Sequence, residues 1–340
     1  MPEGEVAKIG VIGAGSWGTV LAHLLAEKGL DVDLWVRESD VYSEISRERR
    51  NSMFLPGMEL CPQLKPVRSY EEALFEKEVV LMVVPSHVFR EVLVGLRPFL
   101  RKDMTVMTAT KGIENKSLMV MSQVAASVLP EDYMRRFACL AGPSFSKEVC
   151  KRYPTAVTVA CDDLELGKKL QTLFHRDFFR VYVSQDVIGS QLGGALKNVI
   201  AIAAGAADGL GFGYNARAAL ITRGLTEITR LGVAMGANQL TFAGLAGMGD
   251  LVLTCTADLS RNRTVGLKIG KGVSLEEITG STNMVAEGIR TARSAYELAR
   301  KMGVEMPITS QVYQILYEGK QPREAVRELM TRGLKAEFDL

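Results

Sequence analysis

A short apolar run followed at once by three spaced glycines constrains this fold more than any other feature. Residues 8–12, KIGVI, lead directly into Gly13, Gly15 and Gly18 of GAGSWG, and an apolar helical stretch follows. A strand, a glycine turn and a helix start in this order form a diphosphate cradle. Gly13 permits the tight turn, Gly15 lets the backbone approach the phosphates, and Gly18 lets helix and strand pack closely. The helix N-terminus adds free amides. The pattern predicts a dinucleotide-binding unit.

The end of the second expected strand, residues 32–36, bears on which dinucleotide binds. Arg37 stands there, about twenty positions after Gly18, where an acidic residue would hydrogen-bond a ribose and an arginine can hold a 2′-phosphate. Glu38 follows directly, so NAD is not excluded, and Arg37 could instead be a solvated strand-end residue. We expect a pocket that accepts NADP and also tolerates NAD.

Composition and charge bound the class of protein. The 340 residues are enough for two domains, and a net charge of +2 gives no reason to expect nucleic-acid or membrane partners. Five scattered cysteines without a CxxC pair suit a reducing cytoplasm, and three distant histidines show no metal-ligand spacing. The polar, acidic start is unlike a secretory signal. The apolar residues 187–220 are interrupted by Lys197, Asp208 and Arg217, so we expect no membrane-spanning helix.

Strand and helix patterns alternate up to about residue 185 and then give way to helices alone. This order predicts an α/β fold in which residues 1–187 form a doubly wound, mainly parallel Rossmann-type sheet and residues 188–340 an all-helical domain. Ligands bind beyond the carboxyl ends of such strands. The expected strands are 8–12, 32–36, 79–84, 105–109, 137–141 and 156–160. The expected helices are 19–28, 70–75, 88–93, 117–127, 164–174, 195–207, 216–231, 251–255, 287–302, 308–317 and 322–330.

Lys197 is the best candidate for a group that exchanges a proton with a carbonyl oxygen. It carries the only charge between Asp186 and Asp208 and lies near the start of an apolar helical run. Desolvation disfavours an ammonium ion and lowers its pKa towards the range useful for acid–base chemistry. The alternative is a lysine that extends from an amphipathic face into water.

Two further residues could assist such a lysine. Lys111 follows the expected strand 105–109, so it could point into the crevice and steady substrate charge, or it could be a solvated loop lysine. Asp250, in GMGDL, has the setting of a helix N-cap. A carboxylate near a catalytic lysine would also orient its ammonium group, so the two roles of Asp250 are compatible.

A polar cluster at Ser260, Arg261, Asn262 and Arg263 could bind an anion, because arginine binds phosphate through a bidentate fork. Composition alone does not separate this reading from an exposed basic turn. Cys255 lies nearby, and a small buried residue is a better interpretation of it than a nucleophile.

Taken together, these motifs resemble one family over nearly the whole chain: the bacterial NAD(P)-dependent glycerol-3-phosphate dehydrogenases. The motifs occur in the family's order: GAGSWGT from Gly13, LPG from Leu55, VPSH around Pro85, TKGIE from Thr110, AGPSF from Ala141, LKN from Leu196, GDLVLTC from Gly249, SRNR from Ser260 and VAEG from Val285. The family usually has tyrosine where this chain has Phe54, which offers no hydroxyl to the cofactor. Alanine is common where Ser146 stands.

The resemblance implies a role for each matching residue. Lys197 would give and take the proton, assisted by Lys111 and Asp250. The implied cofactor contacts are Gly13, Gly15, Ser16, Trp17, Gly18, Arg37, Phe54, Lys111, Ser146, Arg261, Val285 and Glu287. The implied substrate contacts are Lys111, Gly142, Ser144, Lys197, Asp250, Ser260, Arg261 and Asn262.

The expected reaction is the reversible reduction of dihydroxyacetone phosphate to sn-glycerol 3-phosphate with NADPH or NADH, supplying phospholipid synthesis. The family further implies a cytoplasmic homodimer. Two other functions remain open at this point: a two-domain dehydrogenase for a sugar acid or hydroxyacyl thioester, and a non-catalytic NADP-sensing module. The sequence leaves the cofactor preference and feedback control undetermined.

Overall fold

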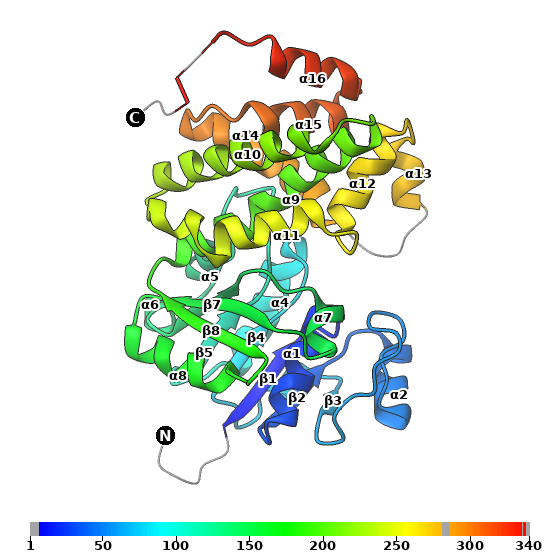
Figure 1. Cartoon of the computed structure of the whole chain (residues 1–340). Coiled ribbons are helices and arrows are strands. Elements are labelled where there is room, and N and C mark those ends of the chain that lie inside the picture. The colour runs from blue at the N-terminus through cyan, green and yellow to red at the C-terminus, as the bar shows by residue number, and fades with distance from the viewer. Residues whose placement is uncertain (1–6, 281–285, 335, 338–340) are drawn as a thin grey trace.

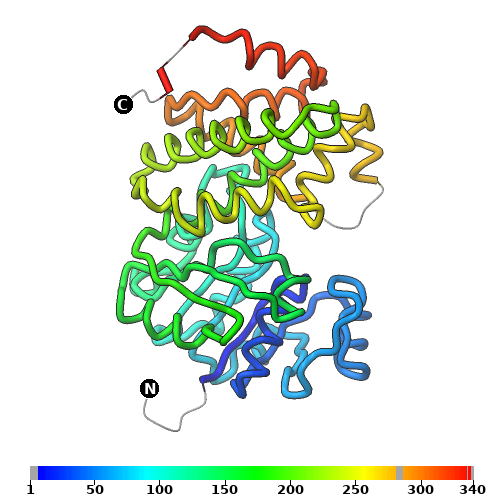
Figure 2. The backbone as a smooth tube through the Cα atoms, in the orientation of Figure 1, coloured from blue at the N-terminus to red at the C-terminus, as the bar shows by residue number. Residues whose placement is uncertain are grey.

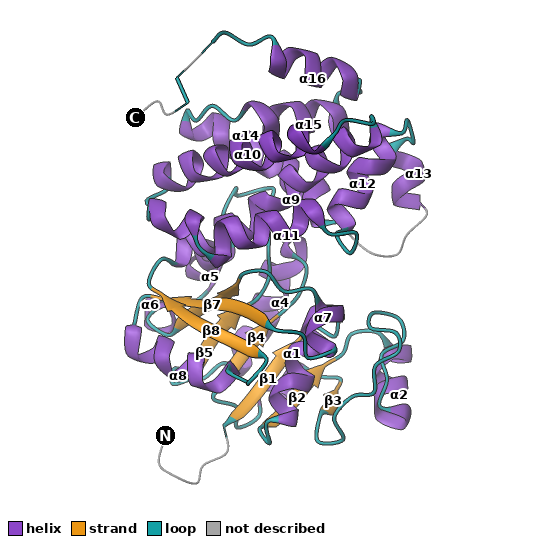
Figure 3. Ribbon diagram, in the orientation of Figure 1, coloured by secondary structure: helices purple, strands orange, loops and turns teal. Residues whose placement is uncertain are grey.

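A computed structural model describes residues 7–280, 286–334 and 336–337. Its sheet-containing half and its helical half lie one above the other (Figure 1), with strands confined to the lower half of the view (Figure 3). The smooth trace of the chain shows the blue, cyan and green segments of the sheet half below the yellow-green to red segments of the helical half, in which α9 and α10 are still green (Figure 2). The predicted fold class, a Rossmann-type sheet followed by helices, is confirmed.

The sheet of the described chain has eight strands in the order β3-β2-β1-β4-β5-β6-β7-β8. All neighbouring strands run parallel except β6 and β7, where Cys139 lies opposite Ala160 in an antiparallel pair. The strand order reverses between β1 and β4, which is where open α/β sheets bind their ligands. The strands are β1 (Lys8–Ile12), β2 (Asp31–Trp35), β3 (Lys65–Val67), β4 (Val79–Met82), β5 (Thr105–Thr108), β6 (Phe137–Ala141), β7 (Thr155–Cys161) and β8 (Phe179–Ser184).

Helices cover both faces of the sheet. Leu21 of α1 and Phe174 of α8 belong to the core on one face, and Phe89 of α4 and Val124 of α5 to the core on the other. The helices of this half are α1 (Ser16–Glu27), α2 (Ser39–Glu48), α3 (Tyr70–Leu74), α4 (Phe89–Leu96), α5 (Met121–Val128), α6 (Glu131–Met134), α7 (Ser146–Cys150) and α8 (Leu164–Phe174), with 3-10 turns at Ser86–Val88 and Arg97–Phe99.

The helical half is built around α9, which packs against α10, α11, α12 and α14. Turns at Gln239–Ala243 (3-10) and Leu245–Gly249 (π-helical) connect α10 to α11. The helices are α9 (Val187–Gly209), α10 (Tyr214–Ala234), α11 (Asp250–Thr256), α12 (Arg261–Gly270), α13 (Leu275–Gly280), α14 (Glu287–Met302), α15 (Pro307–Tyr317) and α16 (Pro322–Met330).

Helix α9 corrects two sequence expectations. It begins at Val187 rather than at residue 195, and the charges of Lys197 and Asp208 do not exclude it as a membrane-spanning helix by composition. By length and composition α9 could therefore cross a membrane, but 89% of its most apolar window is buried inside the protein. It is the core helix of this half. The division of the chain at residue 187 remains a prediction, although β8 ends at Ser184 and α9 begins directly after the short turn that follows.

Candidate active site

The glycine turn has the geometry that a dinucleotide requires. Gly13 has φ +114°, in the region that favours glycine. A Cβ atom at Gly18 would overlap the carbonyl oxygen of Gly13, whereas one at Gly15 would meet nothing within 4 Å. The close approach of helix to strand therefore depends on Gly18, and the space over Gly15 is open. Ser16 and Trp17 begin α1, where backbone amides lack intrahelical partners. This cradle fits the diphosphate of a dinucleotide.

At the end of β2, Arg37 is exposed and held by its neighbour. Its Nε and Nη2 atoms donate to Glu38 Oε1 at 3.0 and 2.8 Å, and 72% of its side chain is accessible. A 2′-phosphate could reach the guanidinium, but it would compete with the Glu38 carboxylate. The role predicted for Arg37 therefore stays a prediction.

Lys197, Asp250 and Lys111 meet between the two halves of the molecule. Lys197 Nζ donates to Asp250 Oδ1 at 2.6 Å and to Thr254 Oγ1 at 2.7 Å, while Lys111 Nζ donates to Asp250 Oδ2 at 2.7 Å. Lys197 comes from α9, Asp250 from α11, and Lys111 from the loop after β5. The carboxylate of Asp250, 1% exposed, therefore holds one ammonium group on each oxygen.

The environment of Lys197 tunes its acidity. Burial lowers the pKa of Lys197 to about 8, and the nearby charge of Lys111 acts in the same direction, while Asp250 opposes both. A lysine with this pKa exchanges protons near neutral pH. The alternative of a lysine extending into water is wrong, because Lys197 is 6% exposed and lies in the middle of α9.

Asp250 does not cap α11. Gly249 holds the N-cap position and Asp250 is the first helical residue, so its carboxylate is free to face the two lysines. Lys111 is also not a solvated loop lysine, since its ammonium donates to the Gly142 carbonyl at 3.0 Å as well as to Asp250. Ser144 Oγ donates to the same carbonyl at 3.1 Å, so the predicted residues Gly142 and Ser144 lie beside Lys111.

The polar cluster from Ser260 to Arg263 is the start of α12 rather than an exposed basic turn. Ser260 is its N-cap and accepts from the Arg263 amide at 3.2 Å. The guanidinium of Arg263 pairs with Asp208 and Asp258, which removes it from an anion site. Arg261 remains solvent-accessible and forms no ion pair within the described chain. Although the residue is accessible, partial desolvation of its guanidinium lowers the pKa of Arg261, while the charge of Glu287 opposes this.

Asn262 already uses both ends of its amide inside the protein. Its nitrogen donates to Asn198 Oδ1 at 2.8 Å and its oxygen accepts from the Gly288 amide at 2.9 Å. One N–H of Asn262 is left for a ligand. These bonds connect α9, α12 and the start of α14.

A cleft of about 820 Å³ collects several of the predicted cofactor residues. Among its lining residues are Ser16, Phe54, Ser146 and Arg261. Trp17 packs instead against the sheet core, and Val285 lies outside the described residues. Lys111, Lys197 and Asp250 are not among the lining residues of this cleft.

Glu287 lies between the cleft and the lysines. Its Oε2 accepts from Ser86 Oγ at 2.8 Å, and a Cβ at Gly112, next to Lys111, would lie 3.5 Å from the same oxygen. Burial raises the pKa of Glu287. Ser86 follows β4, so this hydrogen bond joins the two halves of the molecule.

Three residues of the site had no role predicted from the sequence, although each lies in one of the matched motifs VPSH, LKN and GDLVLTC. Thr254 accepts from Lys197, Ser86 donates to Glu287, and Asn198 accepts from Asn262. For Thr254 a signal existed: it stands four positions after Asp250, on the same face of a helix. Cys255 is buried as expected, and burial raises its pKa to about 12.

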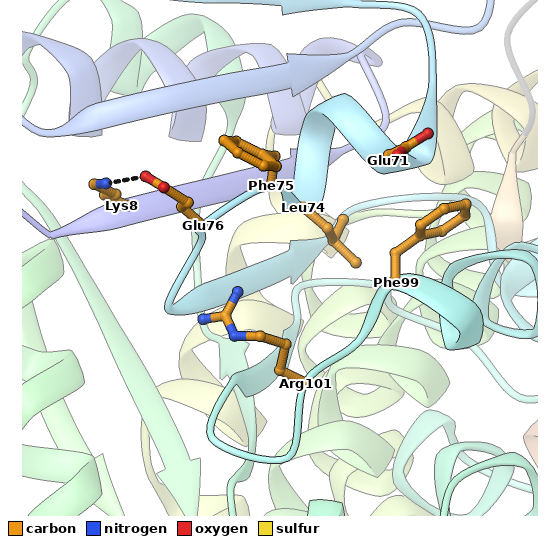
Figure 4. Close-up of a pocket in the computed structure, with 7 residues that line it drawn as sticks. All are labelled: Lys8, Glu71, Leu74, Phe75, Glu76, Phe99 and Arg101. Atoms are coloured by element: carbon orange, nitrogen blue, oxygen red, sulfur yellow. Dashed lines mark hydrogen bonds and ion pairs between the residues drawn. The ribbon is translucent and has the colours of Figure 1, made fainter.

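A second cavity, of about 610 Å³, lies at the amino ends of β1, β4 and β5 (Figure 4). Lys8 begins β1 there, and Glu76 and Arg101 precede β4 and β5. None of the predicted site residues lines it. In the part of the chain that the structure describes, no three His, Cys, Asp or Glu side chains are grouped to hold a metal ion.

The fold and this site define a class: a two-domain dehydrogenase that uses a nicotinamide dinucleotide. The family models described as the N-terminus and C-terminus of NAD-dependent glycerol-3-phosphate dehydrogenase match residues 8–167 and 186–327. The chain belongs to this family, and the resemblance found in the sequence is confirmed.

Similar proteins match over almost their whole length. The glycerol-3-phosphate dehydrogenase [NAD(P)+] of Geobacter sulfurreducens is 59% identical over 97% of this chain and 98% of the relative. That of Syntrophobacter fumaroxidans is 53% identical, with 98% of each covered. The crystal structure of glycerol-3-phosphate dehydrogenase from Coxiella burnetii has a TM-score of 0.92 at 42% identity, covering 96% of this chain and 99% of that one.

Proposed function

We propose that this protein catalyses the reversible reduction of dihydroxyacetone phosphate to sn-glycerol 3-phosphate with NADPH or NADH. The observation that carries the proposal is the pair of ammonium groups held on the one buried carboxylate of Asp250: that of Lys197, which is buried, and that of Lys111, which is partly exposed. A carbonyl that receives a hydride needs both a proton and stabilisation of the charge that develops on its oxygen. Lys197 supplies the proton, and Lys111 stabilises the charge.

Lys197 is the proton donor. When bound, the nicotinamide supplies the hydride to C2 of the triose, and the protonated Lys197 amine gives its proton to the oxygen on that carbon. Thr254 and Asp250 fix the direction of the amine, since both accept hydrogen bonds from it. Lys111 stabilises the developing negative charge. In the reverse reaction the neutral amine takes the proton back.

The phosphate of the substrate is bound away from the reacting carbon. Arg261, Ser260 and the free N–H of Asn262 supply this site at the start of α12. Gly142 and Ser144 lie beside Lys111 and complete the substrate site from the sheet half. Binding energy from the phosphate orients the carbonyl for reaction.

The cofactor occupies the cleft and the glycine cradle. Gly13, Gly15 and Gly18 shape the cradle, Ser16 and Trp17 offer their amides, and Arg37 binds the 2′-phosphate of NADP. We assign the remaining contacts to Phe54, Lys111, Ser146, Arg261, Val285 and Glu287. Phe54 provides apolar contact only, because it has no hydroxyl.

At the level of the cell, the enzyme is a cytoplasmic homodimer whose product supplies phospholipid synthesis. The chain divides functionally into the cofactor domain 1–187 and the catalytic domain 188–340. We expect neither a nucleic-acid partner nor stable insertion into a membrane, and its own substrate is a phosphorylated triose.

Replacing Lys197 by alanine tests the proposal. Turnover of dihydroxyacetone phosphate should fall by roughly two to four orders of magnitude, the range for loss of a positioned acid–base group. The dissociation constant for NADPH should stay within about twofold. Lys168→Ala, which removes an exposed surface lysine, is the matched control. Near-normal turnover by Lys197→Ala would exclude the assigned role.

Two alternative functions are separated by the same assay. A dehydrogenase for a sugar acid or hydroxyacyl thioester would oxidise NADPH faster with the corresponding oxo acid or oxoacyl thioester than with dihydroxyacetone phosphate. A non-catalytic sensing module would turn over none of them. Robust turnover of the phosphorylated triose by the wild type excludes both.

A further inference from the structure

The cleft of about 820 Å³ proposed to bind the dinucleotide, here called the dinucleotide cleft, has an excess of positive charge among its lining side chains. Its lining includes the cations Lys147, Arg261, Lys268, Arg290 and Arg293. Its one lining carboxylate, that of Asp258, is already paired with Arg263. None of the five cations forms an ion pair with a carboxylate in the described chain. Positive charges gathered in a concave site without counter-charges attract an anionic ligand.

Arg290 and Arg261 flank the same carboxylate. Arg290 lies one helical turn after Glu287 in α14, and both guanidiniums act electrostatically on Glu287 to lower its pKa, against the effect of burial. Because Glu287 is anchored to Ser86 of the sheet half, Arg290 faces the crevice between the halves. His87 lies there as well, and the charge of Arg290 contributes to lowering its pKa.

Arg290 differs from the neighbouring Arg293 in having no partner among the residues that the structure describes. The guanidinium of Arg293 stacks on the ring of Tyr317, with its central carbon 4.4 Å from the ring centroid. Arg290 has no hydrogen bond, ion pair or ring contact with any residue that the structure describes. Its planar fork of donors is therefore free to bind a ligand.

We propose that Arg290 binds the diphosphate of the nicotinamide cofactor from the helical half. Ser16, at the N-terminus of α1, lines the same cleft as Arg290, so the cradle amides and the guanidinium would approach the diphosphate from the two halves. This inference rests on the cofactor binding of the proposed function, not on its proton transfer. It adds a positioning residue that closes the helical half onto the cofactor.

Calorimetric titration with NADPH and NADH tests the inference. Arg290→Gln should weaken the binding of both cofactors by the same factor, roughly ten- to hundredfold, the value of a charge-assisted bidentate contact. Arg290→Lys keeps the charge without the fork and should recover part of the loss. Arg293→Gln removes an equal charge one turn away and should change both affinities by less than about threefold.

Each other outcome overturns the assignment. Weakening of NADPH alone would place Arg290 at the 2′-phosphate, and unchanged affinities would show that it contacts no phosphate. A loss that Arg290→Lys leaves unrecovered, together with a lowered melting temperature of the free protein, would show a structural role. Wild-type turnover of dihydroxyacetone phosphate is measured in parallel, so a failure of the proposed reaction is seen separately from a failure of the diphosphate contact.

Discussion

Lys197 has to be charged to give a proton and neutral to take one. With its pKa lowered to about 8, the ammonium form predominates below that pH and the amine above it. The kcat for carbonyl reduction should therefore fall as pH rises through about 8, while kcat for alcohol oxidation should rise through the same range. Asp250→Asn removes a charge that raises this pKa. The fall of kcat for reduction and the rise of kcat for oxidation, the two limbs of the pH profile, should therefore both move to lower pH. Initial rates in both directions across the pH range check this.

An unshifted pH profile in Asp250→Asn would contradict the assignment of Lys197. If the limbs stay in place in Asp250→Asn, the titrating group in the rate profile is not Lys197. The variant Lys168→Ala, whose lysine pairs only with Glu165 on the surface, should leave both limbs unmoved.

At the end of β2, the Glu38 carboxylate competes with the 2′-phosphate of NADP for the guanidinium of Arg37. Because Glu38 holds the Arg37 guanidinium, Glu38→Gln should free it and raise the NADPH-to-NADH preference. The pair is exposed, so the expected gain is modest, about two- to fivefold in the ratio of kcat/KM values. Arg37→Gln should reverse the preference. An unchanged ratio in Glu38→Gln would mean that the carboxylate does not restrain Arg37.

At the scale of elements, the strands around the cradle could be predicted well. β1 and β6 have the predicted bounds, because strands buried on both faces form short apolar runs with clear ends. β3 was missed, since it has three residues including Pro66, at the edge of the sheet. β8 was missed as well. Its first four side chains alternate between buried and exposed, a period of two that the sequence contains.

The helical half was harder to predict, because its packing depends on distant contacts. A Cβ at Gly193 would overlap the backbone of Ala246, so this glycine allows the π-helical turn Leu245–Gly249 to pack closely against α9. The lysine and aspartate of the site could be singled out by chemistry. Their shared geometry could not, since Lys111 and Asp250 are 139 positions apart. The sequence also could not show that Arg263 pairs with Asp208 and is therefore unavailable to bind an anion.

The turn from β1 into α1 allows a matched pair of variants. Gly18→Ala would place a methyl group against the Gly13 carbonyl and should destabilise the protein by about 1–3 kcal/mol, the usual cost of overpacking. Gly15→Ala meets nothing within 4 Å and should keep the wild-type melting temperature, but its methyl group would occupy the diphosphate approach and weaken cofactor binding. Thermal unfolding and cofactor titration of both variants distinguish the two roles. Equal melting temperatures would contradict the packing argument.

On the scale of the whole molecule, two polar contacts join the halves at the site. Lys111 of the sheet half reaches Asp250 of the helical half, and Ser86 reaches Glu287. Substrate and cofactor would lie between these contacts. The same bonds that assemble the site therefore also set how the halves approach each other.

Ser86→Ala tests this coupling. Without the serine hydroxyl, the pKa of Glu287, already raised by burial, should rise further, because the Ser86 hydroxyl now lowers it. At low pH the carboxyl is neutral in both proteins and the variant loses only an ordinary hydrogen bond. As pH rises through the Glu287 pKa, the wild type gains relative to the variant, since the variant must bury the charge without the hydroxyl donor and with only the backbone amide of residue 86 left. In urea unfolding, the free energy of unfolding of Ser86→Ala should be lower than that of the wild type by about 1–3 kcal/mol at pH 8, and this deficit should shrink towards pH 5.

The control variant Ser46→Ala, on the exposed face of α2, should show no such deficit. A deficit that does not depend on pH would mean that Glu287 does not titrate between pH 5 and pH 8, which would contradict the coupling between this hydrogen bond and the charge of Glu287.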